Sequence, residues 1–176
     1  PLIYDSVTNN NDAAVREMLE YLKGQGFAYV VFVMRPGEGI STRTARRQAV
    51  ERYCDDLGLG GEVLVYDDGI DGLRSRIANL LELCGNRKTC LFANNDESIL
   101  EATSAGLRRR VGVCSFADEH WAKYSGPGIT CLDQEPMLMG RRAAQKLFAR
   151  IYDGSEEPCS LDEVPARLCI FASTEI

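Results

Sequence analysis

Short, almost wholly apolar runs alternate with amphipathic segments along this chain, and this alternation constrains the fold more than any other feature. Residues 29–34 (YVVFVM) and 89–93 (TCLFA) have the length and composition of strands buried on both faces of a sheet. The segments 11–24 and 41–57 instead place apolar side chains at helical spacing, and glycine lies at or just after the end of each. Strands that alternate with helices predict an α/β fold, a parallel sheet flanked by helices on both faces.

The same pattern predicts the remaining elements. Further strands are expected at residues 2–4, 62–66, 111–116, 129–132 and 167–171, and further helices at 71–84, 97–107 and 136–151. Residues 118–128 are expected to form an ordered loop, and residues 154–165 a polar connection. Because ligands bind at the carboxyl ends of parallel strands, functional residues are expected in the loops that follow them, at residues 35–41, 67–71, 93–96 and 116–120.

Composition narrows the class of protein. The formal net charge of −6 argues against direct contact with nucleic acid, because domains that bind nucleic acid carry a basic face. No apolar run approaches the ~20 residues of a membrane-spanning helix, and no signal peptide is visible. The seven cysteines form no C-x-x-C pair and are odd in number, which disfavours a metal site or a disulfide framework. We therefore expect a cytoplasmic protein with reduced, mostly buried thiols.

Motifs for catalysis are missing from the sequence. The sole histidine is His120, and neither a G-x-S-x-G turn nor a glycine-rich phosphate loop occurs. No close set of histidine, cysteine and carboxylate residues has the spacing of metal ligands. We expect a protein that is not an enzyme and uses neither a metal nor a cofactor.

Polar and aromatic side chains gather instead at the predicted strand ends. They are Asn94, Asn95, Asp96, Asp118, Arg43, Arg46, Arg47, Phe92 and Phe116. Amide, carboxylate and guanidinium groups beside an aromatic face suit a sugar or a sugar acid, and the arginines favour an anionic form. The Asn-Asn-Asp run is also a good helix cap, so both interpretations stay open.

Seven segments in order resemble the LacI/GalR family of transcription regulators. The most specific is GPGITCLDQEPMLMGRRAAQKLFARIYDG (residues 126–154), which is similar to the family's "PPLTTV-Q-P…MG…A…L…G" crossover and helix. LFANNDESILEA resembles the strand-to-helix element with its Asn-Asp pair, and VGVCSFAD resembles the strand with the "GFD" motif. Weaker matches are PLIYDS, VTNNNDAAVREMLEYLKGQGF, STRTARRQAV and ARLCIFAST.

The resemblance implies two lobes joined by crossover strands, with a small effector bound between them. The chain would begin partway through the N-terminal lobe, with remnants of that lobe and the crossovers at residues 1–6 and 118–151. The C-terminal effector-binding lobe would comprise residues 7–117 and 152–176. The resemblance further implies a homodimer that contacts operator DNA through a helix-turn-helix domain with no counterpart in this chain.

Site residues follow from the same resemblance. Arg47 matches the family's effector-binding arginine, with Arg43 and Arg46 as alternatives if the alignment slips, and Phe92 matches a position that packs on the ligand ring. Asn95 is expected to donate to the ligand, whereas Asp96 is expected to act as a cap.

Asn10 and Asp118 complete the expected site, with Phe116 beside them. Asn10 would stand at the entry to the cleft. The family's aspartate after the aromatic residue is Ala117 here, so Asp118 would take over its contacts.

The function expected is that of a repressor's sensing domain, in which a sugar or sugar acid bound between the lobes changes operator affinity. The alternative is an extracytoplasmic sugar-binding protein of a transporter, which has the same fold and the same ligand chemistry. The sequence does not name the effector.

Overall fold

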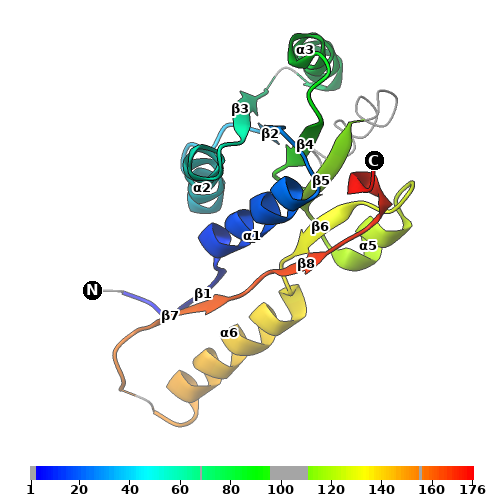
Figure 1. The fold of residues 1–176 in the computed structure, drawn as a ribbon. Coiled ribbons are helices and arrows are strands. Elements are labelled where there is room, and N and C mark those ends of the chain that lie inside the picture. Colours follow the sequence, from blue (N-terminus) through cyan, green and yellow to red (C-terminus); the bar gives the residue numbers. More distant parts are fainter. Residues whose placement is uncertain (1–2, 68, 96–110, 155) are drawn as a thin grey trace.

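The computed structural model describes residues 3–67, 69–95, 111–154 and 156–176 (Figure 1). The strands are β1 (Ser6–Asn9), β2 (Tyr29–Met34), β3 (Gly60–Val65), β4 (Thr89–Ala93), β5 (Gly112–Phe116), β6 (Thr130–Asp133), β7 (Leu161–Val164) and β8 (Arg167–Cys169). The helices are α1 (Asn11–Gly24), α2 (Ser41–Leu57), α3 (Gly69–Cys84), α5 (Glu119–Tyr124) and α6 (Pro136–Ile151), with a 3-10 turn at Ala172–Thr174. The helix expected over 97–107 lies outside the described residues.

A six-stranded sheet in the order β3-β2-β4-β5-β6-β8 forms the larger part of the molecule. Its first five strands pair in parallel, and β8 pairs with β6 in the antiparallel sense. The predicted α/β fold with a mostly parallel sheet is therefore confirmed. The carboxyl ends of β2, β4 and β5 reach the same edge, and there the loops expected to carry function begin.

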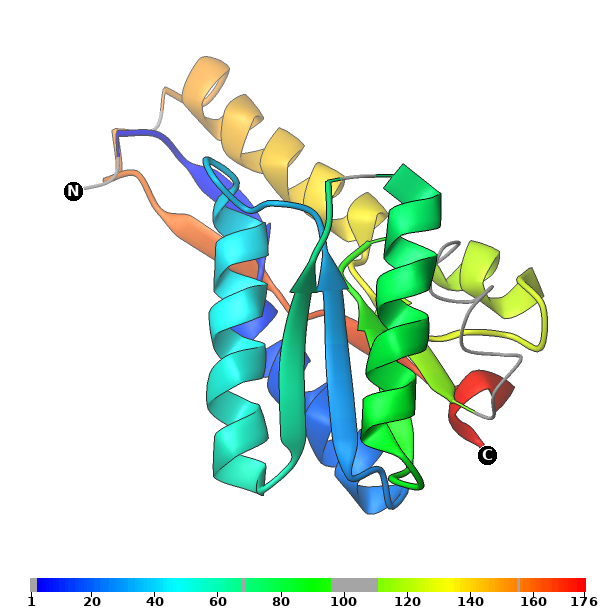
Figure 2. The ribbon, with the colours of Figure 1, turned by 90° about the horizontal axis from the view of Figure 1, so that it is seen from above.

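Helices cover both faces of this sheet, so its central strands are buried on both sides (Figures 1 and 2). On one face, Phe32 and Phe92 pack with apolar side chains of α1 and α2. On the other, Val31 and Leu91 pack with side chains of α3. Because successive strand residues point to opposite faces, an all-apolar run is what two covered faces require.

One close approach fixes the position of α1 relative to the sheet. Gly112 opens β5, and a Cβ atom placed there would lie 2.5 Å from the ring of Phe27, which follows α1. Only glycine leaves room for that ring, so the Phe27 side chain can pack against the backbone at the amino-terminal end of β5.

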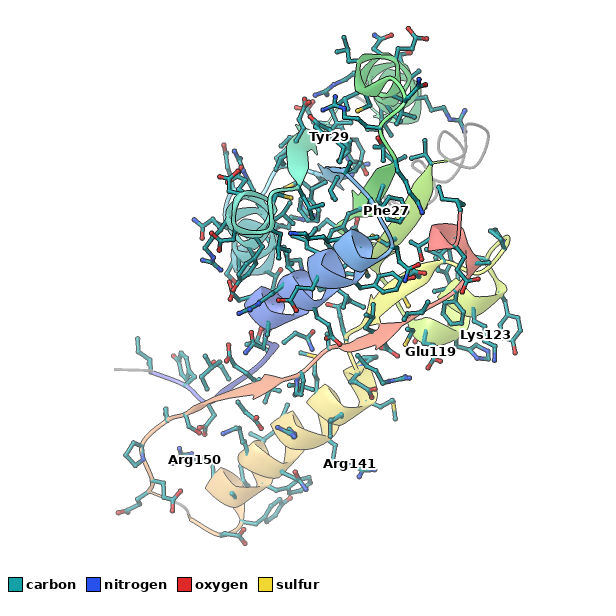
Figure 3. All side chains as sticks on the ribbon, in the orientation of Figure 1. Phe27, Tyr29, Glu119, Lys123, Arg141 and Arg150 are labelled. Carbon is teal, nitrogen blue, oxygen red and sulfur yellow. The ribbon has the colours of Figure 1, made fainter. Side chains whose placement is uncertain are left out.

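A second, two-stranded sheet stands apart from the first. β1 and β7 pair in parallel, and α6 packs along them in the lower part of Figure 1. Figure 3 shows Arg150 and Arg141 on opposite sides of α6. Arg150 donates to Asp5 at 2.8 Å, and Arg142 donates to Asp162 at 2.7 Å, so the helix is held to the strands by ion pairs.

Three local expectations are wrong. Residues 3–4 do not belong to a strand, since the first strand is β1, and the polar connection over 154–165 contains β7. The loop expected at 118–128 contains α5, whose first turn is capped by Asp118. In β7 and α5 few apolar side chains are buried, so the hydrophobic pattern gives little sign of these elements. At the start of the chain the pattern is misleading, because the apolar side chains of Ile3 and Tyr4 are exposed and form no strand.

The division into lobe remnants at 1–6 and 118–151 stays a prediction, and strand pairing groups the residues differently. α5 and β6 belong with the large sheet, whereas β1, α6 and β7 form the smaller part. Within the described residues, none of the helices is both long and apolar enough to cross a membrane.

Candidate functional site

Arg46 is the centre of the polar groups at the carboxyl ends of the strands. It lies in the second turn of α2, and its side chain points inward over the sheet edge. Its Nε donates to Asn11 Oδ1 at 2.7 Å, Nη1 to the carbonyl oxygen of Asn94 at 2.8 Å, and Nη2 to Gln134 Oε1 at 2.7 Å. One guanidinium group thereby joins the start of α1, the end of β4 and the segment that follows β6.

This arginine is buried without a counter-ion among the residues that the structure describes. Only 5% of its surface is exposed, and its hydrogen-bond partners are all neutral amide oxygens. Desolvation by burial lowers the pKa of Arg46 to about 10, because water stabilises the charged form and the interior does so less well. The side chain remains charged at neutral pH.

An aromatic ring forms the floor beneath the guanidinium. The Arg46 Cζ atom lies 3.6 Å from the centroid of the Phe116 ring. Phe116 stacks on Phe92 at 5.7 Å, and Phe92 meets Phe32 edge-on at 5.2 Å. Phe92 is fully buried among these rings in the core, whereas the face of Phe116 is the one that Arg46 covers. The rings hold the planar cation in place by cation–π attraction.

Three segments of the chain connect the large sheet with the small one, and they meet near Arg46. The side-chain amide of Asn9, at the end of β1, donates to the carbonyl oxygens of Gln134 at 2.9 Å and Val164 at 3.2 Å. These three residues belong to three separate passages of the chain. Because Gln134 also accepts from Arg46, a chain of hydrogen bonds links the arginine through Gln134 to Asn9 and from there to Val164.

Asn94 carries a polar atom for which the described residues provide no partner. Its residue is 3% exposed, and its side-chain oxygen is buried without a hydrogen-bond partner within the described structure. Its own carbonyl oxygen accepts from Arg46, so the unused amide is next to the guanidinium in the chain. Buried polar atoms are rarely left without a partner, so this oxygen is an exception among the described residues.

Acidic residues beside the site are paired with a different arginine. Arg167, in β8, donates to Glu135 at 2.8 Å, to Glu119 at 2.6 Å and to Asp133 at 3.4 Å. The hydrogen bonds to Glu119 and then to Glu135 raise the pKa of Arg167. Asp133 and Glu135 flank Gln134 in the chain, yet their charge is directed to Arg167 and away from Arg46.

The other predicted arginines point elsewhere. Arg47 is exposed and donates to Glu51 at 2.9 Å, one helical turn away. It also lines a cavity of about 470 Å³ near the ends of β2 and β3, together with Met34 and Pro36. Arg43 donates to the carbonyl oxygen of Pro36 at 2.9 Å. Of the three predicted arginines, the structure therefore places Arg46, one of the two alternatives to Arg47, at the strand ends with Phe116 and Phe92.

Two further predicted residues act as helix caps. Asn10 accepts from the backbone N–H of Ala13 at 3.0 Å and so caps α1, while Asp118 accepts from that of Trp121 at 3.0 Å and caps α5. Asn95 is half-buried at the end of β4, and Asp96 lies outside the described residues.

Sequence reasoning did not identify Asn11 and Gln134 as partners of Arg46. The helical period gives a weak signal for the arginine itself: Arg46 lies three and four residues before the buried Ala49 and Val50, whereas Arg47 has this spacing to Val50 alone. Nothing comparable marks Gln134, since its contact with Arg46 joins residues 88 positions apart.

The described residues hold no group of three or more histidine, cysteine, aspartate or glutamate side chains that could bind a metal ion. All seven cysteines are free thiols, and six of them are buried. The described site holds one fixed cation stacked on the Phe116 ring and, beside it in the chain, an amide oxygen without a partner among the described residues, which are groups for binding and orientation.

Comparison with known proteins gives a consistent picture. Residues 19–174 match the family model of the periplasmic binding protein-like domain. The HTH-type transcriptional regulator PtxS of Pseudomonas aeruginosa is 33% identical over 178 residues, which cover 97% of this chain and 51% of that protein. The chain thus spans about half the length of the curated relatives it matches.

Solved structures share the fold. A probable maltose operon transcriptional repressor from Staphylococcus aureus superposes with a TM-score of 0.84 at 18% identity, covering 96% of this chain and 61% of that one. A LacI family transcriptional regulator from Enterococcus faecium, with bound ribose, has a TM-score of 0.78 at 17% identity, covering 95% of this chain and 64% of that one. At such identities these likenesses concern the fold alone.

Proposed function

Because the chain belongs to the periplasmic binding protein-like domain family and forms part of a LacI-type effector-binding domain, we propose that it senses a small hydroxylated effector, a sugar or a sugar acid, and changes the operator affinity of the regulator. The role is one of binding and not of catalysis. The observation that carries the proposal is the position of Arg46, whose guanidinium is fixed at the strand ends and bound to Gln134 beside the passages between the two sheets.

The position suits an effector for a physical reason. We propose that the ligand lies at the carboxyl ends of the large sheet near Arg46, beside the chain segments that lead to β1, α6 and β7. We propose that the small sheet with α6 belongs to a second lobe and that the ligand bridges the two parts. A ligand that contacts both parts stabilises one relative orientation over another, and only such differential binding shifts a conformational equilibrium.

The proposed regulator acts in the cytoplasm as a homodimer and contacts operator DNA through a helix-turn-helix domain outside this chain. The relative from Pseudomonas aeruginosa is named an HTH-type regulator, which supports this assignment. In such a dimer, a change of lobe orientation would alter the spacing of the paired DNA-binding domains. Effector and operator would then be coupled reciprocally, each changing the affinity of the other.

The test uses the full-length protein, sugars and sugar acids in a thermal-shift screen, and two matched variants. Arg46→Met and Arg47→Met remove the same charge from neighbouring positions of α2, one buried and one exposed. We expect an effector to raise the melting temperature of the wild type and of Arg47→Met, and to lose this effect in Arg46→Met. The ligand must also change binding to a DNA duplex selected by the full-length protein from a random pool, measured by fluorescence anisotropy.

Two outcomes would overturn the proposal. If no sugar or sugar acid stabilises the folded wild-type protein, the assignment of the effector class fails. If a ligand stabilises the protein but leaves operator affinity unchanged, the coupling to DNA fails. Loss of the ligand effect in Arg47→Met alone would move the site to the cavity that Arg47 lines.

A further inference from the structure

We infer that the peptide group between Gln134 and Glu135 is a two-position switch, which flips when α6 changes its orientation relative to the large sheet. This inference rests on the proposed function, because the change of lobe orientation is proposed there. It follows from a strained backbone conformation at Glu135 and from two hydrogen bonds that hold the peptide in its present position.

The peptide lies where the large sheet is joined to α6. β6 ends at Asp133 and α6 begins at Pro136, so only Gln134 and Glu135 connect them. The other two connections are as short, with one residue between β1 and α1 and two residues between β7 and β8. Because so few residues are available, a tilt of α6 against the sheet must be taken up by their backbone torsions.

Glu135 has a backbone conformation that side chains disfavour. Its φ of 51° and ψ of 52° lie in the left-handed helical region, and no other non-glycine residue of the described structure has a positive φ. Pro136 adds to the strain, because a proline ring disfavours helical torsions in the residue before it. Strain of this kind persists only where neighbouring contacts hold it, and it is common in switch regions.

Two hydrogen bonds hold the peptide at its two polar ends. Its carbonyl oxygen, which belongs to Gln134, accepts from the side-chain amide of Asn9 at 2.9 Å. Its N–H, which belongs to Glu135, donates to Asp133 Oδ1 at 3.0 Å. Both bonds exist only while the peptide points this way, so they offset the strain in the present position and in no other.

A flip would exchange these two bonds for relief of the strain. Half a turn of the peptide brings φ of Glu135 to about −130°, within the range that residues before proline prefer. The carbonyl oxygen of Glu135 belongs to the next peptide, so it keeps the bond from the N–H of Met139 at 3.0 Å and α6 keeps its first turn. The two positions are therefore finely balanced, and a tilt of α6 that moves Asn9 or Asp133 favours one of them.

Two substitutions at one position test the strain. Glu135→Ala and Glu135→Gly both remove the ion pair with Arg167, and only glycine adopts the left-handed conformation without cost. In the full-length protein Glu135→Gly should melt roughly 2–4 °C above Glu135→Ala. At the exposed Glu17 of α1 the same two substitutions should rank in the opposite order, because glycine weakens an ordinary helix.

Reversing the polarity of one hydrogen bond tests the flip. Asn9→Asp keeps the shape of the side chain, but its carboxylate repels the carbonyl oxygen of Gln134 and attracts the flipped N–H. Spin labels on unnatural amino acids at Asp56 of α2 and Gln145 of α6 report the distance between the two parts. Labelled full-length chains are diluted with unlabelled ones, and neither effector nor DNA is present. We expect Asn9→Asp to add a second distance, and Asn86→Asp, on the exposed loop after α3, to keep that of the wild type.

The decisive comparison combines the two changes. Relative to the second distance, Asn9→Asp with Glu135→Gly should keep the wild-type distance about five- to thirtyfold more often than Asn9→Asp with Glu135→Ala, which is the factor that the left-handed strain contributes. An equal ratio in the two double variants, or one unchanged distance in all variants, overturns the inference. So does a Glu135→Gly variant that melts below Glu135→Ala. If Asn9→Asp does not fold, Asp133→Ala removes the other hydrogen bond and takes its place, with the same expectations.

The outcomes separate this inference from the proposed function, because the distances are measured without any ligand. If a sugar or sugar acid changes operator affinity while the distances never change, the switch fails and the proposed function stands. If the distances shift as expected but no sugar or sugar acid stabilises the protein, the proposed effector class fails and the switch stands.

Discussion

The guanidinium of Arg46 lies over the ring of Phe116, with its central carbon 3.6 Å from the ring centroid. The ring does two things at once: it fills the core beside Phe92, and it supports the arginine in the position from which it offers its donors. The packing of the core and the position of the proposed effector-binding arginine therefore both depend on this side chain.

Substituting Phe116 by leucine should separate these two roles. Phe116→Leu and Phe92→Leu each remove a ring from the same buried stack and should cost a similar ~1–2 kcal/mol of unfolding free energy. Only Phe116→Leu removes the surface on which Arg46 rests, so it alone should also weaken effector binding, by about three- to tenfold. Denaturant unfolding and calorimetry measure the two effects. Equal losses of affinity in both variants would show that the stack acts only through stability.

Gly112 should tolerate no side chain. A Cβ atom there would lie 2.5 Å from Phe27 Cζ, and that ring is packed in the core and cannot move freely. Gly112→Ala should cost about 1–3 kcal/mol of unfolding free energy. A Cβ atom at Gly24, the last residue of α1, would meet nothing within 4 Å, so Gly24→Ala should be neutral or stabilising by up to about 1 kcal/mol. Denaturant titration that ranked the two variants equally would contradict this packing.

The ion pair between Asp5 and Arg150 should give a defined acid response. The hydrogen bond from Arg150, followed by that from the backbone of Ser160, lowers the pKa of Asp5 to about 2. In the unfolded chain the pKa of an aspartate carboxyl group is ~3.9. The stabilisation is therefore fully present above about pH 4 and is lost as the pH falls through 2, because the folded state holds the charged form more strongly.

The substitution Asp5→Asn tests how much this ion pair contributes to stability. The melting temperature of the variant should lie below that of the wild type at neutral pH, and the difference should vanish as the pH approaches 2. In an Arg150→Met background the same substitution should have much less effect. A difference that stayed constant down to pH 2 would mean that the charge of Asp5 contributes nothing.

Thiol reactivity should follow burial. Desolvation raises the pKa of Cys54 to about 11 and holds the pKa of Cys131 and Cys114 well above the usual range, so these thiols stay protonated and unreactive. Cys159 is half-buried and the others are buried. In the folded protein a disulfide reagent should modify about one thiol per chain quickly, and Cys159→Ser should abolish this fast phase. A fast phase that survived in Cys159→Ser would mean that a buried cysteine becomes exposed by local opening.

The sequence was sufficient for the elements that two covered faces make wholly apolar, such as β2 and β4. It was insufficient for β7, where Leu161 and Glu163 are exposed and only Val164 is buried, and for α5, where Ala122 is the one buried side chain. β7 is held by pairing with β1 at the other end of the chain, and α5 by packing against β6. The local sequence pattern gives little indication of either contact.

The α/β pattern predicted that Phe116 and a group of arginines lie at the strand ends, and the structure places Arg46 over Phe116 there. Their role in binding an effector stays a prediction. The roles of Asn11, Asn94 and Gln134 depend on how segments far apart in the chain meet, which the folded structure alone reveals. Asn10 and Asp118 show the converse difficulty, because a residue suited to a ligand is equally suited to a helix cap.

The hydrogen bonds of Asn9 to Gln134 and Val164 bring three passages of the chain to one small region. In the proposed change of lobe orientation, this region would act as the pivot, because three attachments so close together permit a tilt more readily than a translation. α6 begins beside that pivot, and its 16 residues make a lever about 24 Å long. A tilt of roughly 10° at Asn9 would carry the far end of the helix through about 4 Å, enough to exchange one set of side-chain contacts for another.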